Sequence, residues 1–349
     1  MPGAASLDEF LAIAARVDPL RAPVAALVRE IAAAGIALAA EIAAPRDAAP
    51  YDAAADGPAS RNRDGDVQKP LDLLANEMFL AAARRAPVAA VASEELADPL
   101  VLDAQAPLAL AIDPLDGSSN IETNLAVGTI FSIRPAGVDA PCSAFASSGE
   151  EQLAAGFLLY GPQTALVLTL GAGTRIFVLD RAARTFRALG RTARIPERTA
   201  EYAINASNYR FWHDPVRAYV DDLVQGADGP RGTDFNMRWI ASLVAEVYRI
   251  LLRGGIFLYP ADQRPGYECG RLRMLYEAHP IAFLVEQAGG AATDGVHRIL
   301  DLAPATIHQR VPLVFGSADK VARLARYHSW TQPFAERAPL FGRRGLLRA

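Results

Sequence analysis

Six short apolar runs in the middle of the chain lack the polar alternation of half-exposed strands. They lie at residues 87–93, 107–112, 127–133, 157–161, 165–170 and 174–180. Short apolar runs of this kind are typical of strands that are buried on both faces of a sheet. Because other elements must cover such strands from both sides, the runs predict a layered α/β protein with mixed sheets.

Segments with helical spacing precede these runs. Residues 7–43 predict two helices, divided at Asp18-Pro19, and residues 70–85 predict a third. The second helix includes the longest apolar run, 24–43, in which Arg29, Glu30 and Glu41 argue against a membrane span. We therefore expect a long alanine-rich helix that packs inside the protein.

A second half of the chain begins near residue 195. Helices are expected at 214–224, 237–253 and 280–288, strands at 256–260, 271–277 and 311–316, and a final helix that begins after Ser317 as its cap. A chain of 349 residues is long enough for about two domains. We expect them at residues 1–194 and 195–349.

The charge and cysteine content narrow the class of protein. Lys and Arg total 35 against 39 for Asp and Glu, and this net charge of −4 argues against a nucleic-acid or membrane-surface partner. Cys142 and Cys269 are far apart and are expected to be free thiols. The N-terminal segment is acidic where a signal peptide is basic. We therefore expect a soluble, cytoplasmic protein.

Four carboxylates follow directly from two of the predicted strands. Glu94 and Glu95 come after the run at 87–93, and Asp113 and Asp116 come after the run at 107–112. If the two strands are neighbours, all four acids converge at one sheet edge, where ligand sites of α/β proteins lie. Their mutual repulsion would be relieved by a divalent cation, and ligands that are all oxygen favour Mg²⁺ or Mn²⁺.

The three residues after Asp116 add a feature that suits an anion. Gly117 allows a close approach of the backbone, and consecutive N–H groups at Ser118 and Ser119 can surround a phosphate. A cation site beside an anion site describes a phosphate bound for hydrolysis. The alternative is an ordinary turn with incidental acids after a strand.

Several long motifs in the chain resemble class I fructose-1,6-bisphosphatases. They are GDVQKPLDLLAN (65–76), VASEE (91–95), DPLDGSSNIETNLAVGTIFSI (113–133), GGIFLYPA (254–261), RLRMLYEAHPIAFLVEQAGG (271–290) and TIHQRVPLVFGS (306–317). The inositol monophosphatases share the DPLDG core, but their WDxAxG-like element is absent here. The resemblance implies the layered αβαβα sugar-phosphatase fold with two mixed-sheet domains.

The resemblance also implies roles for particular residues around the reacting phosphate. The positions that match metal ligands are Glu94, Asp113, Asp116, Glu277 and the carbonyl of Leu115, for more than one Mg²⁺ or Mn²⁺ ion. Asp72 and Glu95 match the acids that activate the attacking water, and Gly117, Ser118 and Ser119 match the cradle of the 1-phosphate. Asp66 matches an acid on a mobile loop, and the composition of residues 44–68 independently suggests either disorder or a lid.

A second group of positions matches the binding site of the distal 6-phosphate. Asn205, Arg238, Tyr259 and Arg271 carry over, with Arg238 implied to reach a neighbouring subunit of a homotetramer. Trp239 and Asn208 stand where the animal pattern has tyrosines, and Arg271 stands where it has a lysine. Arginine keeps the charge but is planar and bulkier.

The function implied by the resemblance is Mg²⁺-dependent hydrolysis of the 1-phosphate of fructose 1,6-bisphosphate, in gluconeogenesis or the Calvin cycle. Sedoheptulose 1,7-bisphosphate is an alternative or additional substrate, because its reacting end is identical. A non-catalytic sugar-phosphate sensor is a third reading, which the intact set of carboxylates disfavours.

The resemblance further implies a weak response to AMP. Members inhibited by AMP have a TGEMT-like turn, a Lys-Tyr pair before the DPLDG strand and an Arg after the VGTIFGI run. The turn is absent here, and the matching positions are Pro107, Leu108 and Pro135. Arg134 is adjacent, but a shift of one residue in a strand points a side chain to the opposite face.

Overall fold

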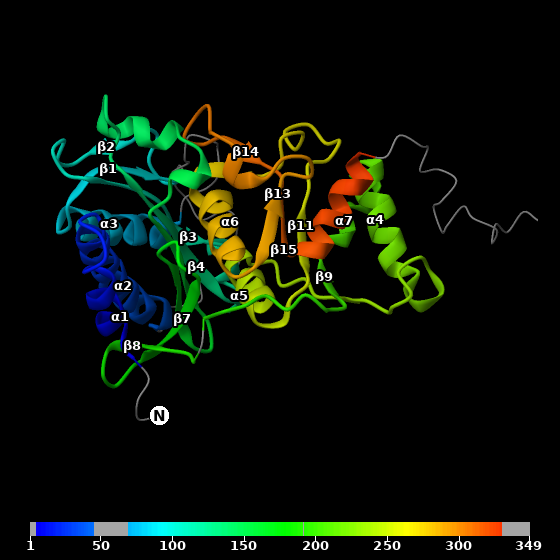
Figure 1. Ribbon diagram of the computed structural model, residues 1–349, viewed down its shortest axis with the longest axis horizontal. Helices are drawn as coiled ribbons and strands as arrows, with labels where there is room; N and C mark the ends of the chain where they lie inside the picture. The colour runs from blue at the N-terminus through cyan, green and yellow to red at the C-terminus, as the bar shows by residue number, and fades with distance from the viewer. Residues whose placement is uncertain (1–4, 45–68, 191, 330–349) are drawn as a thin grey trace, which may run out of the picture.

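The computed structural model describes residues 5–44, 69–190 and 192–329. Five layers are stacked along the long axis of the molecule: helices, a sheet, helices, a second sheet and a last pair of helices (Figure 1). This is the predicted αβαβα arrangement with two mixed sheets. The predicted lid at 44–68, including Asp66, falls outside the described residues except for Ala44.

The first sheet has eight strands in the order β2-β1-β3-β4-β5-β6-β7-β8. Their bounds are β1 (Val88–Ser93), β2 (Leu100–Val101), β3 (Leu108–Asp116), β4 (Val127–Pro135), β5 (Ala154–Tyr160), β6 (Thr164–Thr169), β7 (Thr174–Asp180) and β8 (Thr185–Ala188). Only β1 and β3 pair in parallel, and every other neighbouring pair is antiparallel. Strands β1, β3, β5 and β6 are buried along their whole length, as their uninterrupted apolar sequences predict.

The second sheet has five strands in the order β10-β9-β11-β15-β13. Their bounds are β9 (Glu201–Ala203), β10 (Asn236–Met237), β11 (Ile256–Tyr259), β13 (Gly290–Thr293) and β15 (Leu313–Ser317), and the short strands β12 (Leu272–Arg273) and β14 (Arg310–Val311) pair separately. Residues 195–317 thus build a sheet of their own. The exact domain boundary near residue 195 stays a prediction.

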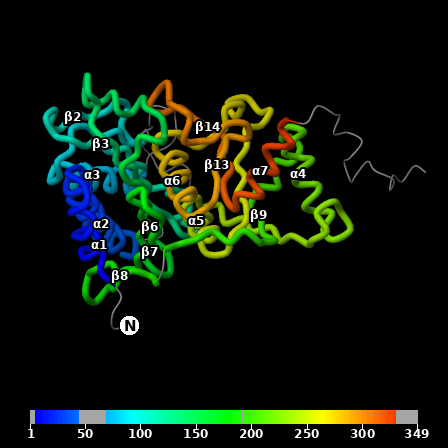
Figure 2. The backbone as a smooth tube through the Cα atoms, viewed as in Figure 1, coloured from blue at the N-terminus to red at the C-terminus, as the bar shows by residue number. Residues whose placement is uncertain are grey.

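Seven α-helices in the described chain form the other three layers. They are α1 (Leu7–Ala14), α2 (Arg21–Ala43), α3 (Pro70–Arg84), α4 (Asp214–Val224), α5 (Leu243–Arg253), α6 (His279–Gln287) and α7 (Ala318–His328). Helices α1, α2 and α3 cover the outer face of the first sheet, α5 and α6 lie between the sheets, and α4 and α7 cover the second (Figure 2). Three apolar clusters fill the spaces between these layers.

Helix α2 is the long alanine-rich helix that the sequence predicts. In the described part of the chain it is the one helix long and apolar enough to cross a membrane, and half of its most apolar window is buried inside the protein. Gly35 lets it approach the sheet, because a Cβ there would lie 2.4 Å from the Leu158 side chain. The two cysteines form no disulfide, as expected.

Three local predictions are wrong. The helix predicted over 237–253 begins only at Leu243. Asn236 and Met237 pair with β9 instead, and Ala241 has a positive φ of 59°. A strand over 271–277 ends at Arg273, after which Met274–Ala278 forms a wide π-helical turn. Ser317 occupies the N-cap position of α7, but its side chain makes no capping hydrogen bond, because its hydroxyl oxygen accepts the Gly255 N–H at 3.2 Å and its hydrogen is donated to the Pro196 carbonyl.

Gly128 in β4 is a packing constraint beside the carboxylates, because it pairs with Asp116. A Cβ at this position would lie 2.5 Å from the Leu158 carbonyl oxygen and 2.6 Å from the Val244 side chain. We expect Gly128→Ala to lower the free energy of unfolding by about 1–3 kcal/mol through overpacking, measured by urea denaturation. Gly161→Ala, where the nearest contact is an ordinary 3.5 Å, is the matched control. Equal losses in the two variants would contradict the packing argument.

Candidate metal centre and distal anion pocket

The parallel pairing of β1 with β3 brings the predicted acids together. Ser93, the last residue of β1, is opposite Ile112 of β3, and the Glu94 N–H donates to the Ile112 carbonyl at 3.1 Å. Glu94 therefore lies beside Asp113, the next residue of β3. The two strands are neighbours, as the convergence of the acids requires.

A break in the β3 register points both aspartates to the same site. Asp113 pairs with Ile130 and Asp116 with Gly128, so the strand gains an extra residue between them. The Leu115 N–H donates to the Asp113 Oδ1 at 3.0 Å within this bulge. Bulges of this kind redirect side chains next to active sites, and here both carboxylates are buried.

Glu277 reaches the same point from the other half of the chain. It lies in the π-helical turn before α6, and its Oε2 accepts the Arg273 N–H at 2.5 Å. One carboxylate oxygen from each of Asp113, Asp116 and Glu277 lies within 4.8 Å of the other two. The Arg273 guanidinium pairs with Glu94 at 2.9 Å, so Glu94 borders this cluster.

The carboxyl groups of the cluster lie so close together that their pKa values are raised. Burial and the neighbouring charges of Glu94, Asp116 and Glu277 raise the pKa of Asp113 well above its ordinary value. Burial, together with Glu94, raises the pKa of Asp116 to about 7. Burial, with Glu94 and Asp116, raises the pKa of Glu277 to about 8. Without a cation, the folded protein therefore favours protonated carboxyl groups here.

The donor set fits a hard divalent cation. Every side chain of the cluster offers oxygen, which Mg²⁺ and Mn²⁺ prefer, and no histidine or cysteine contributes to it in the described residues. The backbone carbonyl of Leu115 lies in the same bulge, between the two aspartates. A bound cation would offset the repulsion that raises these pKa values.

Asp72 stands at the start of α3, on the neighbouring wall of the site. It is buried, and its Oδ2 accepts the Lys69 N–H at 2.7 Å. Burial raises the pKa of Asp72, an effect opposed by the Lys69 amide and by nearby Ser118. The influence of Ser118 links Asp72 to the Gly117-Ser118-Ser119 turn, where Gly117 adopts the left-handed conformation with φ of 75°. Glu95 follows Glu94 and is half-buried.

The start of α5 joins this centre to the second half of the chain. The Val244 N–H points to the Asp116 Oδ2 at 3.4 Å, and the Asn120 side chain donates to the Ala241 carbonyl at 2.8 Å. The loop that carries Gly117, Ser118 and Ser119 is thus tied to the start of the helix between the two sheets.

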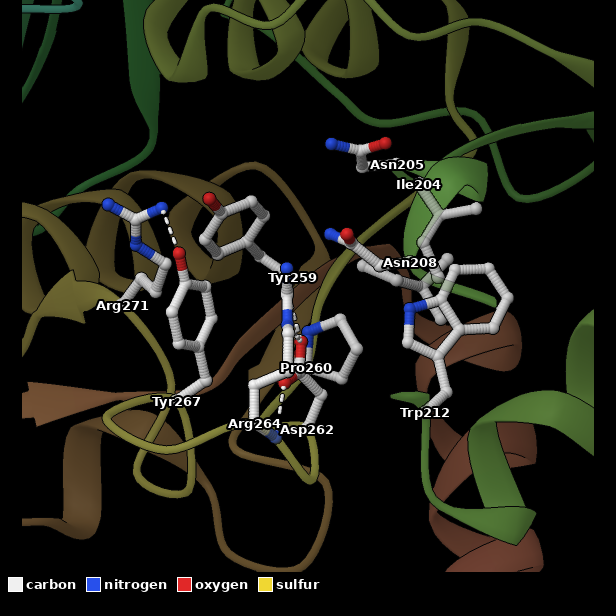
Figure 3. Close-up of a pocket in the computed structure, with 11 residues that line it drawn as sticks. Ile204, Asn205, Asn208, Trp212, Tyr259, Pro260, Asp262, Arg264, Tyr267 and Arg271 are labelled. Carbon is white, nitrogen blue, oxygen red and sulfur yellow. Dashed lines mark hydrogen bonds and ion pairs between the residues drawn. The ribbon is translucent and has the colours of Figure 1, made fainter. Parts of the chain in front are cut away.

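A second site lies at the carboxyl ends of β9 and β11 in the second sheet. A cavity of about 130 Å³ is lined by three predicted residues, Asn205, Tyr259 and Arg271, and by Asn208 (Figure 3). The Trp239 ring stacks on the Tyr259 ring with centroids 6.2 Å apart. Arg238 does not line the cavity. Its side chain is 53% exposed and lies 3.7 Å from Glu201, on the β10 edge of the sheet.

Several residues of this pocket were not predicted from the sequence. Trp212, Asp262, Arg264 and Tyr267 also line it. The segment 261–270 was not singled out, because its aromatic and basic residues have no periodic spacing. Arg273 was not predicted either, although it lies only four positions before Glu277.

Comparison with known proteins identifies the family. Profiles of the fructose-1-6-bisphosphatase N-terminal and C-terminal domains match residues 52–189 and 195–329. The chain belongs to the fructose-1,6-bisphosphatase family. It is therefore one of a family of phosphoric monoester hydrolases, as the sequence motifs predict.

Individual members of the fructose-1,6-bisphosphatase family match nearly the whole chain. A class 1 fructose-1,6-bisphosphatase of Rhizobium meliloti is 55% identical over 99% of both chains. One from Methylorubrum extorquens is 53% identical over 100% of this chain and 99% of its own. The crystal structure of Leishmania major fructose-1,6-bisphosphatase in holo form superimposes with a TM-score of 0.83 and 30% identity, covering 94% of this chain and 100% of that one.

The raised pKa values predict how stability depends on pH. Folded Asp116 and Glu277 titrate near 7 and 8, above their ordinary values of 3.8 and 4.5, so folding favours their protonated forms. This stabilisation is complete below about pH 4 and is lost as the pH rises through 7–8. In EDTA, we expect the melting temperature to fall by about 5 °C or more between pH 5.5 and 8.5, and Mg²⁺ to reverse most of the fall.

Calorimetry of two variants separates this effect from general titration. Asp116→Asn should flatten the pH dependence in EDTA, because it removes one of the buried charges. Asp139→Asn, in an exposed loop, should leave the dependence unchanged. A melting temperature that does not fall with rising pH in EDTA would show that the carboxylates do not repel each other as described.

Proposed function

We propose that this protein hydrolyses the 1-phosphate of fructose 1,6-bisphosphate to give fructose 6-phosphate and inorganic phosphate. The observation that carries the proposal is the meeting of Asp113 and Asp116 of β3 with Glu277 of the π-helical turn, with oxygens within 4.8 Å of one another. The class 1 fructose-1,6-bisphosphatases that match the chain from end to end support this substrate.

We propose two roles for the acids of the site: some are metal ligands, and others accept the proton of the attacking water. We propose that Glu94, Asp113, Asp116 and Glu277, with the Leu115 carbonyl, hold more than one Mg²⁺ or Mn²⁺ ion. Such ions lower the pKa of bound water and neutralise phosphoryl oxygens. Arg273 keeps the Glu94 carboxylate in place through their 2.9 Å ion pair. It also donates its backbone N–H to Glu277, so two proposed ligands share one support.

Asp72 and Glu95 are the proposed acceptors of the water proton. Burial raises the pKa of Asp72, which makes its carboxylate a better base near neutral pH. The left-handed Gly117 starts the turn whose Ser118 and Ser119 are proposed to cradle the 1-phosphate. Asp66 is proposed to close over the site from the segment 44–68.

The distal pocket is proposed to hold the 6-phosphate. Arg271 supplies a positive charge, and Asn205 and Tyr259 supply neutral hydrogen-bond donors, all on the wall of one cavity. Arg238 is exposed on the β10 edge, in keeping with the proposal that it reaches the site of a neighbouring subunit in a homotetramer. We further propose a cytoplasmic enzyme of gluconeogenesis or carbon fixation, made of domains 1–194 and 195–349.

Two other functions remain as alternatives for the test. Sedoheptulose 1,7-bisphosphate offers the same reacting end, with Asn208 and Arg271 at the pocket wall to separate the two sugars. A sugar-phosphate sensor would bind without hydrolysis.

Phosphate release from a panel of sugar bisphosphates tests the proposal. We expect release from fructose 1,6-bisphosphate with Mg²⁺ or Mn²⁺ and none in EDTA. Asp113→Asn should cost about 3 kcal/mol or more in transition-state stabilisation, roughly a 150-fold loss of kcat/KM. A preference for sedoheptulose 1,7-bisphosphate would favour the alternative substrate, and binding without release would favour a sensor.

Asp103→Asn is the matched control for this substitution. Its carboxylate accepts the N–H two residues ahead at 3.0 Å, as that of Asp113 does, but on an exposed turn. It should retain full activity. Full activity in Asp113→Asn or in EDTA would rule out the metal centre.

AMP should inhibit this protein weakly or not at all. Arg134, the arginine adjacent to the position that AMP-inhibited relatives use, is fully buried and donates to the Ser147 hydroxyl at 2.9 Å. Its guanidinium also meets the His279 Nδ1 at 2.7 Å, so it has no freedom to bind a nucleotide. Losing charged hydrogen bonds of roughly 1.5–3 kcal/mol each removes most of the affinity. Half-inhibition at micromolar AMP, with saturating Mg²⁺, would contradict this prediction.

A further inference from the structure

The loop between β11 and β12 is a compact structure that builds one wall of the distal pocket. The Arg264 N–H donates to the Asp262 Oδ1 at 3.0 Å, and the Tyr267 N–H donates to the Arg264 carbonyl at 3.0 Å. The Asp262 N–H closes the loop on the Tyr267 carbonyl at 3.2 Å. A glycine with φ of 80° at position 266 makes the return possible. Tyr267 is therefore held from both sides of its backbone.

Two arginines lie against the Tyr267 ring. The guanidinium carbon of Arg264 is 4.0 Å from the ring centroid, and that of Arg271 is 4.8 Å from it. The Tyr267 hydroxyl also accepts a hydrogen bond from the Arg271 Nη1 at 3.0 Å (Figure 3). An aromatic face attracts cations, so one ring holds two like charges that would otherwise repel each other.

The charges of these two arginines are not equivalent. Asp262 binds the Arg264 guanidinium through both carboxylate oxygens, and Phe211 packs against the same group at 4.9 Å. Arg271 is exposed and forms no ion pair with any residue from the described ranges. The pocket thus presents one neutralised and one uncompensated guanidinium, and the hydroxyl of Tyr267 fixes the uncompensated one.

We infer that Tyr267 is a positioning residue for substrate selection: it holds the Arg271 guanidinium ready for a phosphate remote from the cleaved one. Arg264, neutralised by Asp262, serves as the support of the ring. The inference rests on the proposed function, because it assigns selectivity within the same site. A guanidinium that is fixed before binding loses less rotamer freedom when it meets a phosphate. The expected effect is on KM for substrates that carry two phosphates, with little effect on the chemical step.

Kinetics with two substrates test this role. Fructose 1-phosphate has the same reacting phosphate as fructose 1,6-bisphosphate and lacks the distal one. Tyr267→Phe keeps the ring and removes the hydroxyl, and we expect KM for the bisphosphate to rise about five- to tenfold with kcat within about twofold. The loss of kcat/KM should be several times smaller for fructose 1-phosphate. Equal losses on both substrates would overturn the inference.

A double-mutant cycle shows whether Tyr267 acts through Arg271. In an Arg271→Met background, Tyr267→Phe should change KM for the bisphosphate by less than about 1.5-fold, since the group it positions is gone. Additive effects would overturn the inference. Tyr327→Phe is the matched control, because it removes a hydroxyl that bonds Asp222 in the same half of the chain, away from the pocket. It should leave KM unchanged.

Calorimetric binding of fructose 6-phosphate separates this inference from the proposed function. If the wild type hydrolyses neither substrate, the proposed function is wrong, but binding still reports on the pocket. Affinity several-fold weaker in Tyr267→Phe than in wild type supports the positioning role. Equal affinity of the two proteins overturns it, whatever the hydrolysis assay shows.

Discussion

The repulsion among buried carboxylates is the constraint on which the rest of the structure depends. Asp113, Asp116 and Glu277 are each buried and lie close enough to raise one another's pKa. Such a cluster persists only where the surrounding structure fixes it in place. The one parallel pair of the first sheet, β1 with β3, supplies two of the segments, and the turn before α6 supplies the third. The two sheets and the helices between them therefore act as a frame around one unfavourable group of charges.

The carboxylate cluster and the distal pocket differ in how each could attract an anion. At the carboxylate cluster, the chain offers negative charge, and we propose that bound cations allow a phosphate to approach it. At the distal pocket it offers an arginine, amides and a tyrosine hydroxyl directly. The segment from Tyr259 to Glu277 contributes to both sites. Tyr259 and Arg271 line the pocket, Arg273 pairs with Glu94 beside the cluster, and Glu277 belongs to the cluster. Residues 259–277 therefore contribute to both of the proposed phosphate sites.

The sequence predicted the layers and the acids well, because both depend on strong local signals. Uninterrupted apolar runs locate buried strands, and Asp113 and Asp116 follow one of them directly. The family motifs were needed for Glu277, whose predicted strand is in fact a π-helical turn. Tyr267 and Arg264 escaped notice, since their function depends on how an aperiodic loop folds back on Asp262. The helix α5 was predicted to begin too early for a similar reason. Ala241 adopts a positive φ, and nothing about an alanine indicates that conformation in advance.

The π-helical turn at Met274–Ala278 has a consequence for how chains of this family can change in length. A wide turn of this kind holds one residue more than a regular helical turn, and it sets the direction of every side chain before α6. Deleting one residue there would rotate Glu277 by about 100° around the helix axis and carry its carboxylate out of the cluster. A change in the length of residues 261–270 would leave the direction of Glu277 unchanged, because the pairing of β12 with β14 restores the register after them. Insertions and deletions among homologues should therefore accumulate before β12, where they reshape the distal pocket, and stop at Leu272.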